Sequence, residues 1–140
     1  MQIELIGTAI LCDQPRAAAD WFIEHFGFEL GVDIDWYVNV QHPRHRNYSL
    51  DFLASEHGSM PEGLRGHTVG GTLLAFLVED VEAEERRLRA AGQKVVLPLA
   101  REPWGQYRFQ LAGPQGLFVE VLQRVPPDPQ WLRDNDLAPE

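Results

Sequence analysis

The 140-residue sequence contains a single cysteine, Cys12, which excludes an internal disulfide and favours a reducing, cytoplasmic setting. Long hydrophobic runs are also missing, since no segment approaches the roughly 20 apolar residues that a membrane-spanning helix needs. The first residues, MQIELIG, lack the positive region and the long apolar stretch of a secretory signal. We therefore expect a soluble protein without a membrane partner.

Basic residues are scarce as well. Lysine and arginine number 12 against 21 acidic residues, which gives a formal net charge of -9. Proteins that bind nucleic acids need a basic face, so we expect no nucleic-acid partner. The acidic balance would attract a cationic ligand, although an acidic surface that maintains solubility is the simpler interpretation. The hydrophobic fraction of 44% is typical of a globular chain long enough to bury a core.

The first half of the chain predicts a strand, a helix and three strands. Residues 2–12 are apolar and partly β-branched, which predicts a strand buried on both faces. Asp13 is placed to cap the following helix, Pro15 suits its first turn and Gly27 ends it. Polar or proline-containing breaks then separate three extended segments, at 28–32, 36–40 and 48–53.

The second half repeats this order after a linker at 58–71, whose glycines predict either a connection between modules or a mobile flap over a ligand. Asp80 caps the second helix. The repeat predicts an α+β fold made of two βαβββ modules, at 2–57 and 72–124. The remaining segment, 125–140, is a proline-rich tail in which Trp131 favours docking by a short turn.

The stretch EPWGQYRFQLAGPQGLFVE at 102–120 is the most informative part of the second module. It predicts a loop with Trp104, a strand with alternating aromatic residues, a Gly-Pro-Gln-Gly turn and a strand that ends at Glu120. Such a turn supplies backbone angles that ordinary residues resist, so Leu111 and Leu117 should flank a hairpin.

A chain of two βαβββ modules that carries this stretch resembles the vicinal oxygen chelate superfamily. That superfamily includes glyoxalases, extradiol dioxygenases, fosfomycin-modifying enzymes and bleomycin resistance proteins, and the Glu-Pro-Trp-Gly run is especially similar to the bleomycin resistance branch. The resemblance covers 2–123. It implies one domain, 1–140, whose modules form a curved sheet around a cavity. It also implies a homodimer with two equivalent sites.

The resemblance also bears on metal binding. In metal-dependent members each module supplies two ligands, one from its first strand and one from its last. The resemblance places Gly7 and Leu73 at the first and third positions, where neither side chain can bind a metal. The second position falls near Ser49 or Asp51, and the fourth matches Glu120. Because a catalytic centre needs about three protein ligands, we expect no metal and no cofactor.

The candidate ligand-binding residues are aromatic or acidic. Trp104 in its Pro-Trp-Gly turn suits stacking against a flat or cationic ligand. Asp51 and Glu120 occur within apolar strands, where a carboxylate must find solvent, a donor or a ligand. Phe109 suits the core as well as a ligand contact, and either Trp36 or Tyr37 could reach the cavity. The full set is Trp36, Tyr37, Tyr48, Asp51, Trp104, Tyr107, Phe109 and Glu120.

Histidines give a weaker signal. His42 and His45 lie in the run Gln-His-Pro-Arg-His-Arg, which predicts a solvated loop whose arginines would repel a metal cation. His57 directly precedes the glycine-rich segment and His67 lies in it, and both favour the same interpretation. His25 is expected on the surface of the first helix or half-buried there.

The sequence leads to two main functional hypotheses and one further possibility. The first is metal-independent binding and sequestration of a small aromatic or cationic compound, as in antibiotic resistance. The alternative is a metal-dependent glyoxalase, lyase, isomerase or dioxygenase, with a divalent metal held by Glu120, Asp51 and a loop histidine. A metal-free enzyme that uses Glu120 or Asp51 as a base is a third possibility.

Overall fold

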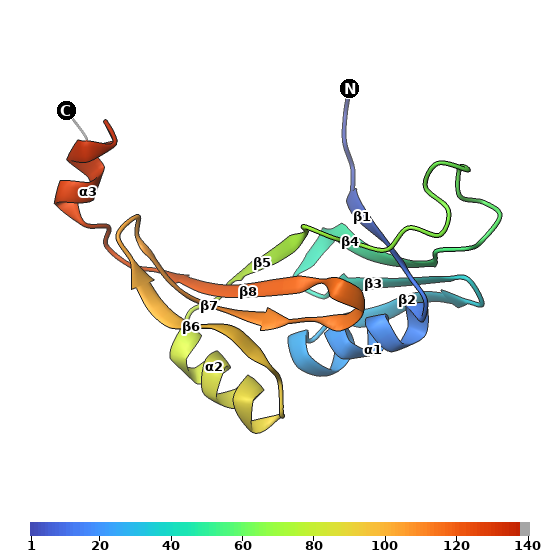
Figure 1. Ribbon diagram of the computed structural model, residues 1–140, viewed down its shortest axis with the longest axis horizontal. Coiled ribbons are helices and arrows are strands. Elements are labelled where there is room, and N and C mark those ends of the chain that lie inside the picture. The colour runs from blue at the N-terminus through green and yellow to red at the C-terminus, as the bar shows by residue number, and fades with distance from the viewer. Residues whose placement is uncertain (138–140) are drawn as a thin grey trace. The chain divides into compact units, whose positions relative to one another are not determined.

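The computed structural model describes residues 1–137; the last three residues of the expected tail lie outside the described part. The fold is α+β, as the sequence predicts (Figure 1). The chain divides into two compact units, one of residues 1–71 with 114–116 and one of residues 72–113 with those from 117 onward. None of the helices in the described residues is long and apolar enough to span a bilayer.

The first unit is a four-stranded sheet with one helix. Its elements are β1 (Ile6–Cys12), α1 (Pro15–Phe26), β2 (Glu29–Ile34), β3 (Tyr37–His42) and β4 (His45–Ala54). The strand order is β1-β4-β3-β2, with β1 parallel to β4 and the other pairs antiparallel. Helix α1 contacts all four strands. The largest fully buried side chains of this unit are Phe22, Phe52, Ile10, Leu50, Val38 and Val40.

The second unit repeats that arrangement. Its elements are β5 (Leu73–Leu77), α2 (Val81–Ala90), β6 (Val95–Glu102), β7 (Gln106–Ala112) and β8 (Phe118–Arg124). The strand order is β5-β8-β7-β6, with β5 parallel to β8. Helix α2 lies along one face of this sheet (Figure 1). The same order of elements and the same strand order in both units confirm the two βαβββ modules.

The start of the chain departs from the prediction. Strand β1 begins at Ile6 rather than at residue 2, and its first pairing is with Tyr48, although β4 itself begins at His45. The prediction of a strand buried on both faces is wrong at this end, where Ile6 is 59% exposed.

The ends of the two helices follow different rules. The N-cap residue of α1 is Gln14, which makes no side-chain capping hydrogen bond. The prediction of Asp13 as the cap is therefore wrong. Pro15 occupies the first turn of the helix, so the cap is the residue directly before Pro15. Gly27 ends α1 in the left-handed conformation (φ 70°), as predicted. Asp80 caps α2 by accepting a 2.9 Å hydrogen bond from the backbone N–H of Ala83.

The tail docks through a short helix, where the sequence predicted docking by a short turn. Helix α3 (Pro129–Asp134) begins after Asp128, whose backbone N–H donates to the carbonyl of Pro103 at 2.8 Å. The ring centroid of Trp131 lies 6.2 Å from that of Trp104. The tail therefore packs against the loop between β6 and β7, within the second unit.

Candidate functional site

Each sheet has one face against its helix and one face turned away from it, which we call the helix-free face. Along β3 and β4, the buried residues Val38, Val40, Leu50 and Phe52 occupy the α1 side. Since side chains alternate along a strand, the residues between them lie on the helix-free face. The polar side chains that gather there are Tyr37, Asn39, Ser49 and Asp51, which we call the Asp51 cluster.

The carboxylate of Asp51 is the acceptor in this cluster. Its Oδ1 accepts hydrogen bonds from the Tyr37 hydroxyl and the Asn39 amide, both at 2.7 Å. Its Oδ2 accepts from the Ser49 hydroxyl at 3.1 Å. Asn39 lies directly opposite Asp51 in the ladder between β3 and β4. Three neutral donors therefore fix the orientation of a half-buried carboxylate.

Burial first, then the hydrogen bond to Asp51 and the charge of that carboxylate, together raise the pKa of Tyr37 to about 12. A raised pKa in the folded state contributes stability that is fully present below the ordinary value of 10 and is lost as pH rises through about 12. The phenol of Tyr37 therefore remains a hydrogen-bond donor to Asp51 throughout the neutral range.

Tyr37→Phe should remove this alkaline dependence. We expect wild-type stability to fall more than that of the variant between pH 9 and pH 12, by about 1–2 kcal/mol after solvent screening of a half-buried group. Urea unfolding of both proteins at several pH values measures the difference in their free energies of unfolding. The titration of other groups contributes equally to both proteins and cancels in this difference. Parallel pH profiles for the two proteins would contradict the role of burial at Tyr37.

Gly7 lies beside the Asp51 cluster. It is opposite Ser49 in the parallel ladder of β1 and β4. A Cβ atom at this position would lie 3.0 Å from Asp51 Oδ2 and 3.1 Å from Ser49 Oγ. A larger side chain here would therefore have to displace the carboxylate.

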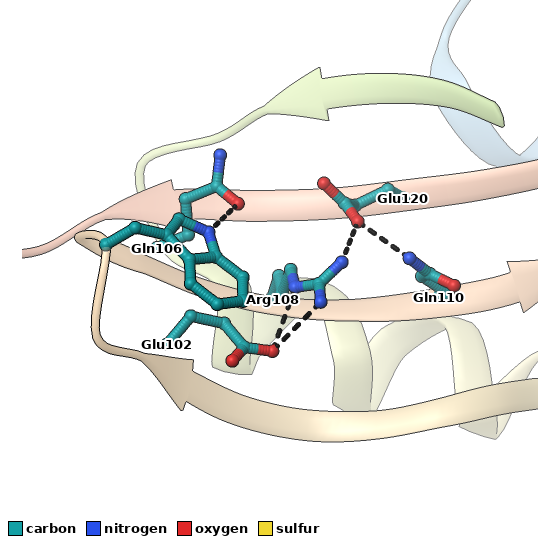
Figure 2. Close-up of polar contacts among 6 residues, drawn as sticks. Glu102, Gln106, Arg108, Gln110 and Glu120 are labelled. Atoms are coloured by element: carbon teal, nitrogen blue, oxygen red, sulfur yellow. Dashed lines mark hydrogen bonds and ion pairs between the residues drawn. The ribbon is translucent and has the colours of Figure 1, made fainter. Parts of the chain in front are cut away.

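The helix-free face of the second unit carries the Glu120 cluster, which consists of Glu102, Arg108, Gln110 and Glu120 (Figure 2). Arg108 Nη1 donates to Glu120 Oε2 at 2.6 Å, and its Nε and Nη2 each lie 3.0 Å from Glu102 Oε1. Gln110 adds a 2.8 Å hydrogen bond to the same oxygen of Glu120. Glu120 is only 6% exposed, so these donors compensate a buried carboxylate.

Arg108 is the cation of this cluster. The hydrogen bond to Glu120 is the largest of the causes that raise the pKa of Arg108 above its ordinary value. The guanidinium is therefore charged at every working pH. It bridges two carboxylates that belong to two different strands, β6 and β8.

Trp104 borders the Glu120 cluster. Its indole is 40% exposed, and its Nε1 donates to the side chain of Gln106 at 2.8 Å. The Arg108 guanidinium carbon lies 5.3 Å from the centre of the indole ring, within the range of a cation–π contact. Trp104 is thus an exposed aromatic surface with a fixed orientation.

The structure brings together Tyr37 with Asp51, and Trp104 with Glu120 through Arg108. Other candidate residues lie elsewhere. Phe109 is fully buried, on the α2 side of β7, and the Tyr107 hydroxyl on that side donates to Glu82 of α2 at 2.9 Å.

Two further candidates lie in the first unit. Tyr48 shares a 2.8 Å hydrogen bond with Thr8, on the α1 side of the sheet. Trp36 is in the turn between β2 and β3 rather than in a strand, and its ring stacks on His57 with centroids 4.0 Å apart. That stack ties the glycine-rich segment to this turn.

The prediction that His42 and His45 lie in a loop is wrong. His42 and His45 are the last and first residues of paired strands rather than loop residues, and they lie opposite each other. Burial lowers the pKa of His42, and the neighbouring His45 lowers it further. His25 is buried instead of surface-exposed or half-buried.

A metal site of the superfamily type does not fit these residues. Gly7 and Leu73 supply no ligand atom, and the guanidinium of Arg108 places a positive charge against Glu120. Within residues 1–137, no group of three or more histidine, cysteine, aspartate or glutamate side chains is placed to hold a metal ion.

Sequence reasoning singled out the two carboxylates and missed most of their donors. Asn39, Gln110 and Arg108 were not proposed as site residues. The signal that could have found them is cross-strand register, because Asn39 lies opposite Asp51 and Gln110 lies opposite Glu120.

The sequence also matches a known family. The sequence model of the Glyoxalase/Bleomycin resistance protein/Dioxygenase superfamily matches residues 5–121, and the chain belongs to this superfamily. Among curated proteins, none matches the chain.

Solved structures from several bacteria share this fold. TioX from Micromonospora sp. ML1 is 21% identical, with a TM-score of 0.70 over 86% of this chain and 98% of that chain. TnmS3, an antibiotic binding protein from Streptomyces sp. CB03234, is 24% identical, with a TM-score of 0.63 over 86% and 94%. Lactoylglutathione lyase from Agrobacterium tumefaciens is 24% identical, with a TM-score of 0.67 over 85% and 92%. At these identities the likeness shows the shared fold.

Proposed function

We propose that this protein binds and sequesters a small aromatic or cationic compound, of the kind met in antibiotic resistance, without a metal. The observation that carries the proposal is the ion pair between Arg108 and Glu120. Glu120 matches a ligand position of metal-dependent members, and here its charge is already compensated by a side chain. Support also comes from TnmS3, an antibiotic binding protein with the same fold.

The alternative function is a metal-dependent enzyme of the same superfamily. Asp51 and Glu120 are oxygen donors that favour it, and lactoylglutathione lyase from Agrobacterium tumefaciens has the same fold. The donors around both carboxylates, and the missing side-chain ligands at Gly7 and Leu73, favour the binding protein. Metal analysis of protein purified without a chelator separates the two functions, since a stoichiometric divalent ion would support the enzyme.

A ligand panel tests the binding function directly. Tryptophan fluorescence and thermal unfolding should respond to at least one planar or cationic drug and to no divalent metal. A compound present at 100 times its dissociation constant should stabilise the protein by about 2.7 kcal/mol. Failure of every planar and cationic compound to change either signal would refute the proposal.

The oligomeric state and the cellular setting form part of the same proposal. We propose a homodimer with two equivalent sites in a cytoplasmic protein, on the resemblance to the superfamily and on the single cysteine. Light scattering at micromolar concentration measures the dimer, and a monomeric mass would contradict it.

A further inference from the structure

We propose that Asp51 binds a positively charged nitrogen of the ligand, in the space left by the missing side chain of Gly7. The ligand class is then an aromatic compound that carries an ammonium or amine group. This inference rests on the proposed binding function. It specifies that the ligand is positively charged and that the charged group contacts Asp51.

The first argument is charge. The donors to Asp51 are a phenol, an amide and a hydroxyl, and all of them are neutral. No ion pair of Asp51 occurs among the described residues, whereas Glu120 has Arg108 as its cation. Charge-assisted hydrogen bonds are roughly twice as strong as neutral ones, so an ammonium is the donor that gains most at Asp51. An anionic ligand would be repelled.

The second argument is acceptor capacity. A carboxylate offers about four lone-pair sites. Oδ1 of Asp51 accepts two hydrogen bonds, from Tyr37 and Asn39, while Oδ2 accepts one from Ser49 in the described part of the chain. Oδ2 is therefore the oxygen that can accept a further donor without the loss of an internal hydrogen bond.

The third argument is access from Gly7. Its φ lies outside the left-handed region, so backbone conformation does not require glycine at this position. Glycine is required instead because of a close contact, since a Cβ at this position would lie 3.0 Å from Asp51 Oδ2. Gly7 is exposed, and the three nearest atoms to that Cβ position belong to the side chains of Asp51, Ser49 and Leu5, with Leu5 Cδ2 at 3.8 Å.

Aromatic surface lies next to the carboxylate in the same unit. Tyr37 donates to Asp51, and the ring of Trp36 lies 5.8 Å from that of Tyr37. His57 already stacks on one face of Trp36, and the ring faces that remain free favour a flat group and also a cation, through their negative potential. The geometry therefore suits an ammonium attached to an aromatic ring.

The test uses three probes that share a naphthalene ring system and differ in charge. They are 1-naphthylmethylamine, which is a cation, 1-naphthylmethanol, which is neutral, and 1-naphthoate, which is an anion. Isothermal titration of the full-length wild-type protein should show the amine binding at least about tenfold tighter than the alcohol, since charged hydrogen bonds exceed neutral ones. The carboxylate probe should bind most weakly.

Asp51→Asn removes the charge while it preserves the shape. The asparagine oxygen can still accept from Tyr37 and Asn39, and its amide can donate to Ser49 Oγ, so the variant should fold. We expect the amine to bind this variant no better than the alcohol does. Gly7→Ala should weaken the amine by a similar factor, because the added Cβ closes the approach to Oδ2.

Asp33→Asn is the matched control. It removes the same charge from the same unit, but Asp33 pairs with Arg16 of α1, and its loss should leave the amine preference intact. Equal binding of the amine to wild type and Asp51→Asn would overturn the inference and leave the binding function standing. A wild-type protein that binds the naphthyl probes without preference for the amine would also overturn it. Failure of these probes and of the whole drug panel would overturn the proposed function as well.

Discussion

Replacing Phe109 with alanine is expected to lower the free energy of unfolding by about 3–5 kcal/mol. The Phe109 side chain is fully buried in β7, and Val121 of β8 lies directly opposite it. Alanine would leave a cavity beneath α2 that the packed neighbours can fill only in part. Denaturant unfolding followed by circular dichroism measures the loss.

The matched variant is Tyr107→Phe, on the same face of the same strand. It removes only an exposed hydroxyl that donates to Glu82, so its effect on stability should be much smaller. Phe109→Leu should give an intermediate loss, and it provides a folded protein if alanine is not tolerated. Near wild-type stability of Phe109→Ala together with lost ligand binding would contradict the core assignment and favour the ligand site.

The βαβββ repeat was predictable because its signals are local. Gly27 ends α1 in a conformation that other residues resist, and Asp80 caps α2 with its own side chain. The start of β1 was not predictable in this way, because pairing with β4 starts only at Tyr48 although β4 already begins at His45. Residues 2–5 have the composition of a strand but no partner before Ile6, which pairs with Tyr48.

The carboxylates of the two clusters, Asp51 and Glu120, were also predictable, because an acidic residue within an apolar strand demands a partner. Their partners depend on the register between strands, which composition does not show. The face of the sheet on which each β7 side chain lies was predictable from the alternation of side chains along the strand. Arg108 and Gln110 form a polar set in β7, and Phe109 belongs to the apolar set. An apolar set packs against a helix, so the polar set marks the helix-free face.

Arg108→Ala is expected to lower the free energy of unfolding by about 3 kcal/mol. Removal of one partner from a buried ion pair costs about 3–5 kcal/mol, because it leaves the other charge uncompensated. The side chain of Arg108 is 20% exposed, which places the effect at the lower end. Glu120 would keep only the hydrogen bond from Gln110. Urea unfolding at pH 7 measures the change.

The double variant Arg108→Ala with Glu120→Gln separates the ion pair from the loss of arginine packing. If the uncompensated charge of Glu120 is the cause, neutralising it should restore much of the lost stability, since the large penalty comes from leaving one charge of a buried pair without its partner. If the double variant is as unstable as Arg108→Ala, the loss comes instead from the contacts that the arginine makes with Trp104 and Glu102. The coupling between the two substitutions therefore measures how far Arg108 acts as the counter-ion of Glu120.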